Sequence, residues 1–177
     1  MVSRDAATRL TPLGETIDKL TLLELRAGNL PMWGLVDRLY ERLRSKTGRP
    51  QSLLAAEKLL ENVKRDDVVI LITGFAVPPW IPVGETDGPL GAASLARAAN
   101  LGLKARALVL TDDYQVEMIK ATCSAAELRV APPEQIRDLP QTMAVGAFPL
   151  TSIDDSVGAA RQILDELAPT AVISMER

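Results

Sequence analysis

The chain has 177 residues with a formal net charge of -3, of which 47% are hydrophobic and 24% charged. This composition is that of a globular protein and excludes collagen, coiled coil and disorder as the main class, while the length fits roughly one domain. Only 3% of the residues are aromatic. Together with the acidic balance this excludes a typical nucleic-acid-binding surface, so we expect no nucleic-acid partner. Histidine is absent, which excludes every histidine-dependent triad, zinc site or proton transfer within the chain.

Three features of the sequence bear on its location. The single cysteine, Cys123, can form no internal disulfide, which is typical of a reducing compartment. The N-terminal residues MVSRDAATRL lack the apolar segment of a secretory signal. The longest apolar stretch, from Val68 to Ile72, is far shorter than the ~20 residues of a membrane span. The sequence therefore predicts a cytoplasmic protein without membrane contact.

Helical patterns occupy the first third of the chain. Apolar residues recur at helical spacing over 32–43 and again over 53–63, which predicts two amphipathic helices. An earlier helix is expected over 17–25, and residues 1–12 are expected to form a loose arm. We therefore predict an N-terminal helical segment over residues 1–67.

After residue 67 the pattern changes to alternating strands and helices. The segment Val68–Ile72 is β-branched and apolar without alternation, as expected for a strand covered on both faces. Further strands are predicted over 105–110, 128–130 and 142–148 and from residue 171, with helices over 89–100 and 114–121 and behind a capping box at Ser152. This rhythm predicts an α/β fold over 68–177, a layered, mostly parallel sheet flanked by helices and preceded by the N-terminal helical segment.

Polar residues follow the predicted strands at their carboxyl ends, where parallel sheets bind ligands. The first strand leads into Thr73-Gly74-Phe75, the second into Thr111-Asp112-Asp113, and the last into Glu176-Arg177. We therefore expect acidic groups to gather at one edge of the sheet.

The segment GETDGPLGA, residues 84–92, gives the strongest local indication of a ligand site. Asp87 stands where a helix N-cap is expected and Pro89 close to the first helical position. Gly88 lets a ligand approach the backbone closely, and N–H groups at a helix start favour a carboxylate or a phosphate. Glu85 and Asp87 offer oxygen ligands for Mg²⁺, Mn²⁺ or Ca²⁺.

A purely structural interpretation of these acidic residues stays open. Asp87 can act only as a helix cap, and Glu85 can be a solvated loop residue. Asp112-Asp113 is more typical of a cap and turn, and Glu176 with Arg177 can form a surface ion pair of little energetic weight.

Three further side chains are expected to have structural roles. Cys123 is expected to be a small core residue rather than a nucleophile, because nothing nearby in sequence would lower its pKa. Trp33 and Trp80 are expected to pack rather than to bind a ligand.

The same motifs resemble the D-glutamate cyclase-like family. The resemblance is carried by TGF followed by PP, by ETDGPLGA leading into LARA, and by strands ending in TDD and ER. It covers about residues 16–177. It implies a layered α/β enzyme that converts D-glutamate to 5-oxo-D-proline with a divalent metal, Mg²⁺ or Mn²⁺, with Ca²⁺ as a further option.

The resemblance identifies, position by position in the motifs, the residues of this chain that correspond to the family's site. Glu85, Thr86 and Asp87 look like the segment that binds the metal or the substrate, with Glu85 and Asp87 as metal ligands and Gly88 beside the substrate. The neighbouring wall would be Thr73, Gly74 and Phe75.

The resemblance also implies residues that complete the catalytic site. Asp112 and Glu176 match family positions that face the same cleft. Because histidine is absent, one of these two carboxylates is the candidate base that removes the ammonium proton, unless a partner subunit supplies the base. Arg177 is expected to hold the α-carboxylate of the substrate through two hydrogen bonds.

The chain departs from the family pattern in one respect. Family members continue past the strand that here ends in Glu176-Arg177, and their later part carries a motif of the type GDGGNE. Neither GDGG nor GGNE occurs in this sequence. The resemblance is thus to the N-terminal half of the family domain, and we expect a split enzyme in which a second subunit supplies the missing motif. Its substrate would be a small acidic molecule or a cyclic amide, and the direction of the reaction stays open.

Two other functions remain as alternatives. Carboxylates, a metal and a helix N-terminus would equally suit metal-dependent hydrolysis of a phosphoester. The chain can also be a non-catalytic structural or small-acid-binding subunit of a heteromer, with its leucine-rich helices serving as an interface.

Overall fold

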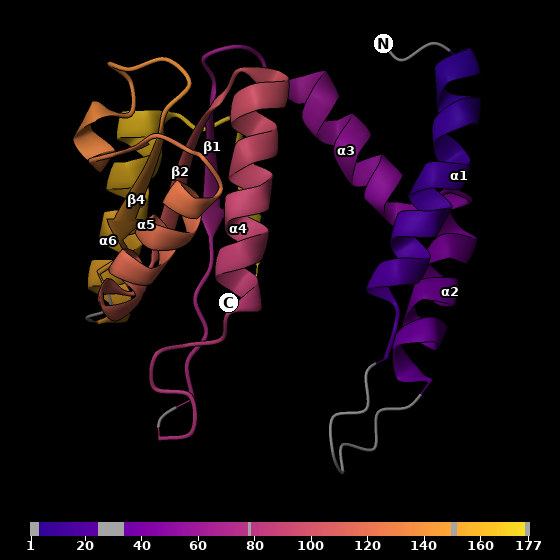
Figure 1. Cartoon of the computed structure of the whole chain (residues 1–177), viewed down its shortest axis with the longest axis horizontal. Helices are drawn as coiled ribbons and strands as arrows, with labels where there is room; N and C mark the ends of the chain where they lie inside the picture. The colour runs from indigo at the N-terminus through magenta and orange to yellow at the C-terminus, as the bar shows by residue number, and fades with distance from the viewer. Residues whose placement is uncertain (1–3, 25–33, 78, 150–151, 176–177) are drawn as a thin grey trace. The chain divides into compact units, whose positions relative to one another are not determined.

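The computed structural model describes residues 4–24, 34–77, 79–149 and 152–175 (Figure 1). The chain divides into two compact units, Met1–Asn62 and Val63–Arg177. The sequence analysis sets this boundary after residue 67. Among the described helices none is both long enough and apolar enough to cross a bilayer.

The first unit contains the helices α1 (Arg4–Thr21), α2 (Leu35–Thr47) and α3 (Gln51–Asn62). The last two correspond to the predicted helices. The expected loose arm is wrong for residues 4–12, which belong to α1, and α1 ends before residue 25. Pro12 lies inside this helix, where a proline lacks a backbone donor and its ring crowds the carbonyl four residues earlier. Leu10 and Leu13 extend the apolar spacing of Ile17 towards the N-terminus.

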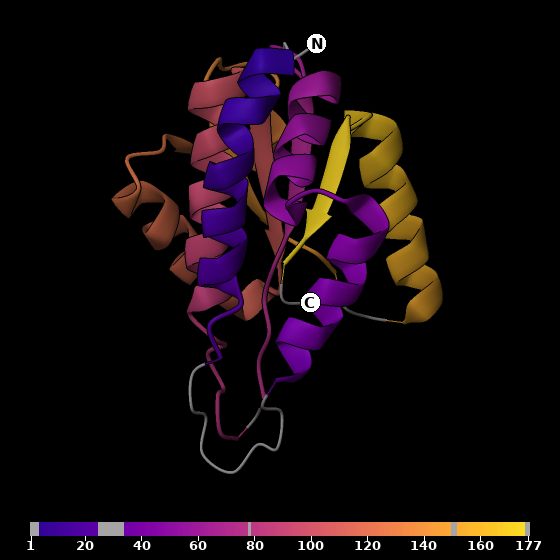
Figure 2. The same cartoon turned by 90° about the vertical axis from the view of Figure 1, so that its right-hand side faces the viewer.

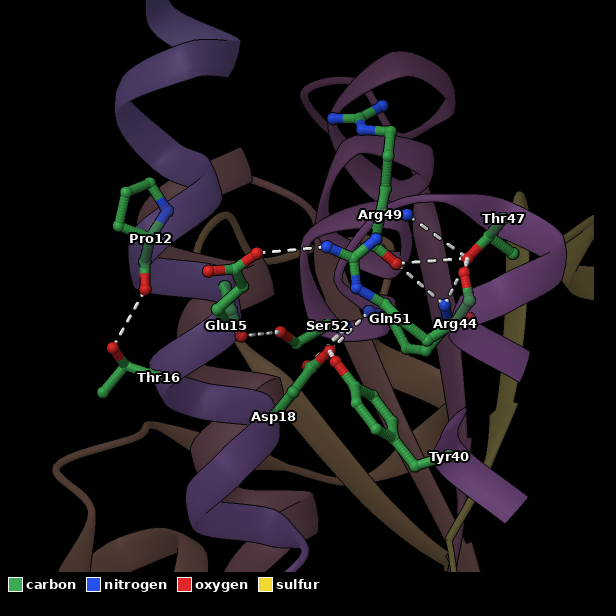
Figure 3. A network of polar contacts seen from close by, with 11 residues as sticks. Pro12, Glu15, Thr16, Asp18, Tyr40, Arg44, Thr47, Arg49, Gln51 and Ser52 are labelled. Atoms are coloured by element: carbon green, nitrogen blue, oxygen red, sulfur yellow. Dashed lines mark hydrogen bonds and ion pairs between the residues drawn. The ribbon is translucent and has the colours of Figure 1, made fainter. Parts of the chain in front are cut away.

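A single carboxylate joins the three helices of this unit (Figure 3). Asp18 of α1 is 3% exposed. It accepts hydrogen bonds from the Tyr40 hydroxyl at 2.8 Å and from the backbone N–H groups of Gln51 and Ser52 at 2.6 and 3.0 Å. Burial opposes ionisation of Asp18, but the hydrogen bonds from Ser52, Tyr40 and Gln51 outweigh burial and lower its pKa below the ordinary 3.8. Asp18 therefore caps the start of α3 from another helix.

The second unit is built on a five-stranded parallel sheet. Its strands are β1 (Val68–Ile72), β2 (Arg106–Thr111), β3 (Val130–Ala131), β4 (Met143–Ala147) and β5 (Ala171–Ser174). They lie in the order β3-β4-β2-β1-β5, and every neighbouring pair is parallel. The predicted α/β class is confirmed.

Helices cover both faces of the sheet (Figures 1 and 2). The helices α4 (Asp87–Arg97) and α5 (Val116–Ala125) pack against each other on one face, and α6 (Ile153–Leu167) lies on the other. Because side chains alternate along a strand, Ile70 and Leu108 face α6 and form a buried cluster with Ile136, against which Ile163 and Leu167 of α6 pack.

The ends of two helices can be compared with the start and stop residues that the sequence predicts. Ser152 Oγ accepts a hydrogen bond from the Asp155 N–H at 3.1 Å, so the N-cap of the predicted capping box is confirmed. The expectation that Asp87 is an N-cap is wrong. Thr86 is the N-cap, its own backbone is helical, and its side chain makes no capping hydrogen bond. The same helix continues beyond the expected residue 100 as a π-helix, Ala98–Leu103, and closes at Lys104, which has a φ of 60°.

Candidate functional site

The loop between β1 and α4 is packed onto one buried amide. Gln115 ends the short 3₁₀ helix Asp113–Gln115 that follows β2, and its side chain is fully buried. Its Oε1 accepts a hydrogen bond from Thr111 Oγ1 at 3.1 Å, and its Nε2 donates to the Val83 carbonyl at 3.3 Å. A Cβ atom at Gly74 or Gly84 would overlap this amide, and both glycines have positive φ angles of 121° and 89°. Only glycine fits at these two positions.

The same loop folds back on itself as a small hairpin. Val77 and Ile81 exchange two backbone hydrogen bonds of 3.1 and 2.8 Å. The Glu85 N–H then donates to the Phe75 carbonyl at 2.9 Å. The structure therefore brings the Thr73-Gly74-Phe75 segment next to Glu85, although 85 and 75 lie at opposite ends of the loop.

The acidic residues before α4 differ in exposure. Glu85 is half-buried, Thr86 and Asp87 are exposed, and Gly88 is buried. Asp87 is the first residue of α4, so its carboxylate stands at the positive end of the helix dipole. Within the described ranges, no group of three or more Asp, Glu or Cys side chains comes together as a metal site. Glu85 and Asp87 thus provide two candidate ligands.

Asp112 and Thr73 lie at the carboxyl ends of β2 and β1. Asp112 is 7% exposed, and its Oδ2 accepts a hydrogen bond from the Tyr114 hydroxyl at 3.0 Å. Thr73 is fully buried and its N–H donates to the Leu110 carbonyl at 3.1 Å. Its Oγ1 has no hydrogen-bond partner in the described part of the chain. A buried hydroxyl left unpaired costs about 1–3 kcal/mol, so this atom is available to a ligand that reaches it.

Other expectations have different outcomes. Glu176, Arg177 and Trp33 lie outside the described residues. The expectation that Trp80 packs is wrong, because this side chain is 80% exposed at the tip of the hairpin. Cys123 is buried as expected, and burial raises the pKa of its thiol to about 11.

Sequence reasoning missed Gln115. The glycines at 74 and 84 indicate a loop with unusual backbone angles, but they do not identify the residue on which it packs. A polar residue four positions after a strand-ending threonine is the only local signal. That signal is too common to predict a buried amide.

The sequence is similar to a known protein family. The model described as D-glutamate cyclase-like, C-terminal, matches residues 35–177, which confirms the family that the motifs indicated. The match begins later than the expected residue 16. The matched model is of a C-terminal domain, and the expectation that this chain resembles the N-terminal half of that domain stays a prediction. Neither the curated proteins nor the solved structures yield a match.

Proposed function

The chain belongs to the D-glutamate cyclase-like, C-terminal family, and on this premise we propose that it is a subunit of a metal-dependent enzyme that forms or opens a small lactam. The reaction would be of the type that links D-glutamate with 5-oxo-D-proline. The observation that carries the proposal is the family match, which spans every candidate residue from Thr73 to Arg177.

The proposed metal ligands are Glu85 and Asp87. Protein sites for Mg²⁺ commonly use one or two carboxylates and complete the shell with water and substrate oxygens, so the two carboxylates at the start of α4 fit such a site. We propose that a second subunit contributes further groups. When bound, the ion would neutralise the reacting carboxylate and polarise its C–O bond.

The backbone at the start of α4 is proposed to hold a substrate carboxylate. The first N–H groups of a helix have no acceptor within the helix, and the Thr86 side chain does not cap them. These donors and the helix dipole both favour an anion. Thr73 Oγ1 and the segment through Phe75 would form the adjacent wall, with Arg177 as the proposed partner of the α-carboxylate.

Lactam formation needs a base. The ammonium group must lose a proton before its nitrogen can attack the side-chain carboxylate carbon, after which the new N–C bond forms and the C–O bond breaks with loss of water. We propose Asp112, buried at the end of β2, or Glu176 as the group that accepts this proton. Opening of the lactam would use the same groups in reverse.

Replacement of Asp87 tests the proposal. In the natural assembly purified with its partner, Asp87→Asn should abolish interconversion of D-glutamate and 5-oxo-D-proline and weaken Mn²⁺ binding by about tenfold or more, because an oxygen ligand loses its charge. The free energy of unfolding should change by less than about 1 kcal/mol, since Asp87 is exposed. Turnover and metal binding are measured by chromatography and calorimetry.

The control is Asp113→Asn, which removes an exposed carboxylate from the turn after β2. This variant should keep both turnover and Mn²⁺ affinity. Full turnover in Asp87→Asn would contradict the metal-ligand assignment. Hydrolysis of p-nitrophenyl phosphate by an assembly that leaves both D-glutamate and 5-oxo-D-proline unchanged would replace the lactam proposal with phosphoester chemistry.

A further inference from the structure

A cavity of about 420 Å³ lies between α6 and the sheet. Its floor is formed by apolar side chains of the sheet, among them Ile70 and Ile72, and its roof by Ala160 and Ile163 of α6. Val172 of β5 lines one side and is 49% exposed. The cavity therefore opens to solvent beside the edge strand.

The cavity follows from the way this face is covered. Five strands spaced about 4.8 Å apart span roughly 20 Å, whereas one helix with its side chains is about 10 Å across. The opposite face carries α4 and α5, but within the described part of the unit Val63–Arg177 α6 is the one α-helix on this face. Ile136 joins the buried cluster of this face, and the space over β1 and β5 stays unfilled.

The cavity reaches the carboxyl ends of the strands at the point where two neighbouring strands lead to helices on opposite faces of the sheet. Thr111 ends β2 and Phe148 follows β4, and both line the cavity. These neighbouring strands lead into α5 and α6, which lie on opposite faces of the sheet. The crevice created where adjacent parallel strands diverge in this way is the usual place for a ligand in an open α/β sheet.

The lining selects for ligand chemistry. Among the described residues no charged side chain lines the cavity, and the hydroxyls that face it are those of Ser156 and Ser174. Thr111 Oγ1 lies on the opposite face of the sheet, where it donates to Gln115 Oε1, and Ser156 Oγ donates to the Pro149 carbonyl at 3.4 Å. The proton of the Ser156 hydroxyl is thus already used, so its oxygen is offered to a ligand as an acceptor. An ionised ligand would lose its hydration here without a charged partner.

We propose that this cavity binds a small, uncharged and largely aliphatic molecule that carries a hydroxyl donor. Its volume lies within the roughly 300–1,000 Å³ of small-molecule sites, whereas a stable protein interface needs about 800 Å² from each partner. A small ligand is therefore the occupant that the cavity fits. The proposal does not depend on the lactam chemistry.

Titration of the full chain with cyclohexanol and 1-hexanol, followed through ¹³C-labelled methyl groups by NMR, tests the proposal. Both probes should cause saturable shifts at Ile72, Ile163 and Val172. The affinity for hexanoate at pH 7 should be lower than that for the alcohols by at least about tenfold, because its carboxylate cannot be desolvated without a partner. Shifts that rise without saturation, or that scatter over the surface, would overturn the proposal.

Substitutions on α6 and β5 separate a binding site from loose packing. Ala160→Leu fills the cavity and should lower the affinity for cyclohexanol by about tenfold or more. Gly158→Leu is the matched control on the same helix, because a Cβ there meets nothing within 4 Å, and it should leave the affinity unchanged. Val172→Asp places a charge at the half-exposed mouth of the cavity and should also weaken binding of cyclohexanol. This second variant tests the proposal if Ala160→Leu does not fold.

Two outcomes would assign the cavity differently. A rise in melting temperature for Ala160→Leu with unchanged affinity for cyclohexanol would mean that the space is a packing defect. Light scattering that shows a dimer, with the Val172 signal changing on dilution and not with the alcohols, would mean that a second copy covers this face. Either result refutes the small-ligand proposal.

Discussion

Gln115 determines the shape of the loop that carries the candidate site. Its amide is hydrogen-bonded to Thr111 on one side and to the Val83 carbonyl on the other. The two glycines at 74 and 84 let the backbone approach this amide without a side chain in between. The position of Glu85 and Asp87 therefore depends on a residue that binds no ligand in our proposal.

Gly84→Ala should disturb this arrangement. A non-glycine residue in an unfavourable positive-φ conformation costs about 1–3 kcal/mol, and the new Cβ would overlap Gln115 Nε2, so the loss of unfolding free energy should reach or exceed that range. Gly158→Ala is the control, since its Cβ meets nothing within 4 Å and the helix should gain about 0.5–1 kcal/mol. Urea denaturation measures both. An unchanged midpoint in Gly84→Ala would show that the loop does not pack on Gln115.

At the site, the sequence predicts local features better than distant contacts. The string ETDGP predicts a helix start and two carboxylates beside it, because capping and proline preferences act within a few residues. It misplaces the cap by one residue, since Thr86 already has helical backbone angles. The contact between Gly84 and Gln115 cannot be predicted this way, because it depends on how β1 and β2 pair.

Among the elements, α1 and α3 show how one buried charge can link helices. Asp18 satisfies two N–H groups at the start of α3 and the hydroxyl of Tyr40 on α2. Hydrogen bonds to an ionised acceptor are stronger than those between neutral groups. The N-terminal unit therefore depends on the ionised form of Asp18.

Asp18→Asn should destabilise the helices of the N-terminal unit by about 1–3 kcal/mol at pH 7. Because the folded-state pKa of Asp18 lies below 3.8, its contribution is full above that value and is lost as the pH falls through the lower folded pKa. The variant should lack this part of the pH dependence. Helical circular dichroism during urea denaturation at pH 7 and below pH 3.8 measures both effects.

The control for this experiment is Asp37→Asn, an exposed carboxylate in the first turn of α2. Its loss should cost about 0.3–1 kcal/mol through the helix dipole. Equal destabilisation by Asp18→Asn and Asp37→Asn would show that the Asp18 hydrogen bonds contribute little.

Strands and helices differ in how well their patterns predict them. The strand Val68–Ile72 has the bounds that its uninterrupted apolar run predicts, because a strand buried on both faces needs no alternation. The helix α1 is missed over its first half because Pro12 is a common signal for a helix break. Leu10 and Leu13 nevertheless continue the helical spacing of Ile17, and they lie beside Leu53 of α3.

For the whole molecule, the class is predictable and the strand order is not. Alternating strands and helices indicate a parallel α/β sheet. The order β3-β4-β2-β1-β5 depends on the direction of each crossover, which leaves no trace in local spacing. The cavity under α6 is likewise a property of the assembled sheet.

Cys123 provides a direct measure of opening of the unit Val63–Arg177. Its thiol is fully buried and has a pKa of about 11 against an ordinary 9.0, so its thiolate fraction near pH 8 should be about 100-fold lower than that of a free thiol. Iodoacetamide should therefore label the native chain slowly and the urea-unfolded chain fully, as followed by mass spectrometry. Cys123→Ser should take up no label. Labelling of the native chain at the rate of free cysteine would contradict the buried position.

The pairing of β5 with β1 has a consequence for biosynthesis. Val69 of β1 pairs with Ala171 of β5, its partner roughly a hundred residues later in the chain, and contacts of such long range slow folding. During translation β1 emerges early but keeps one edge unsatisfied until β5 has left the ribosome. The nascent sheet then exposes an apolar, uncharged edge of the kind that chaperones bind and that aggregation exploits.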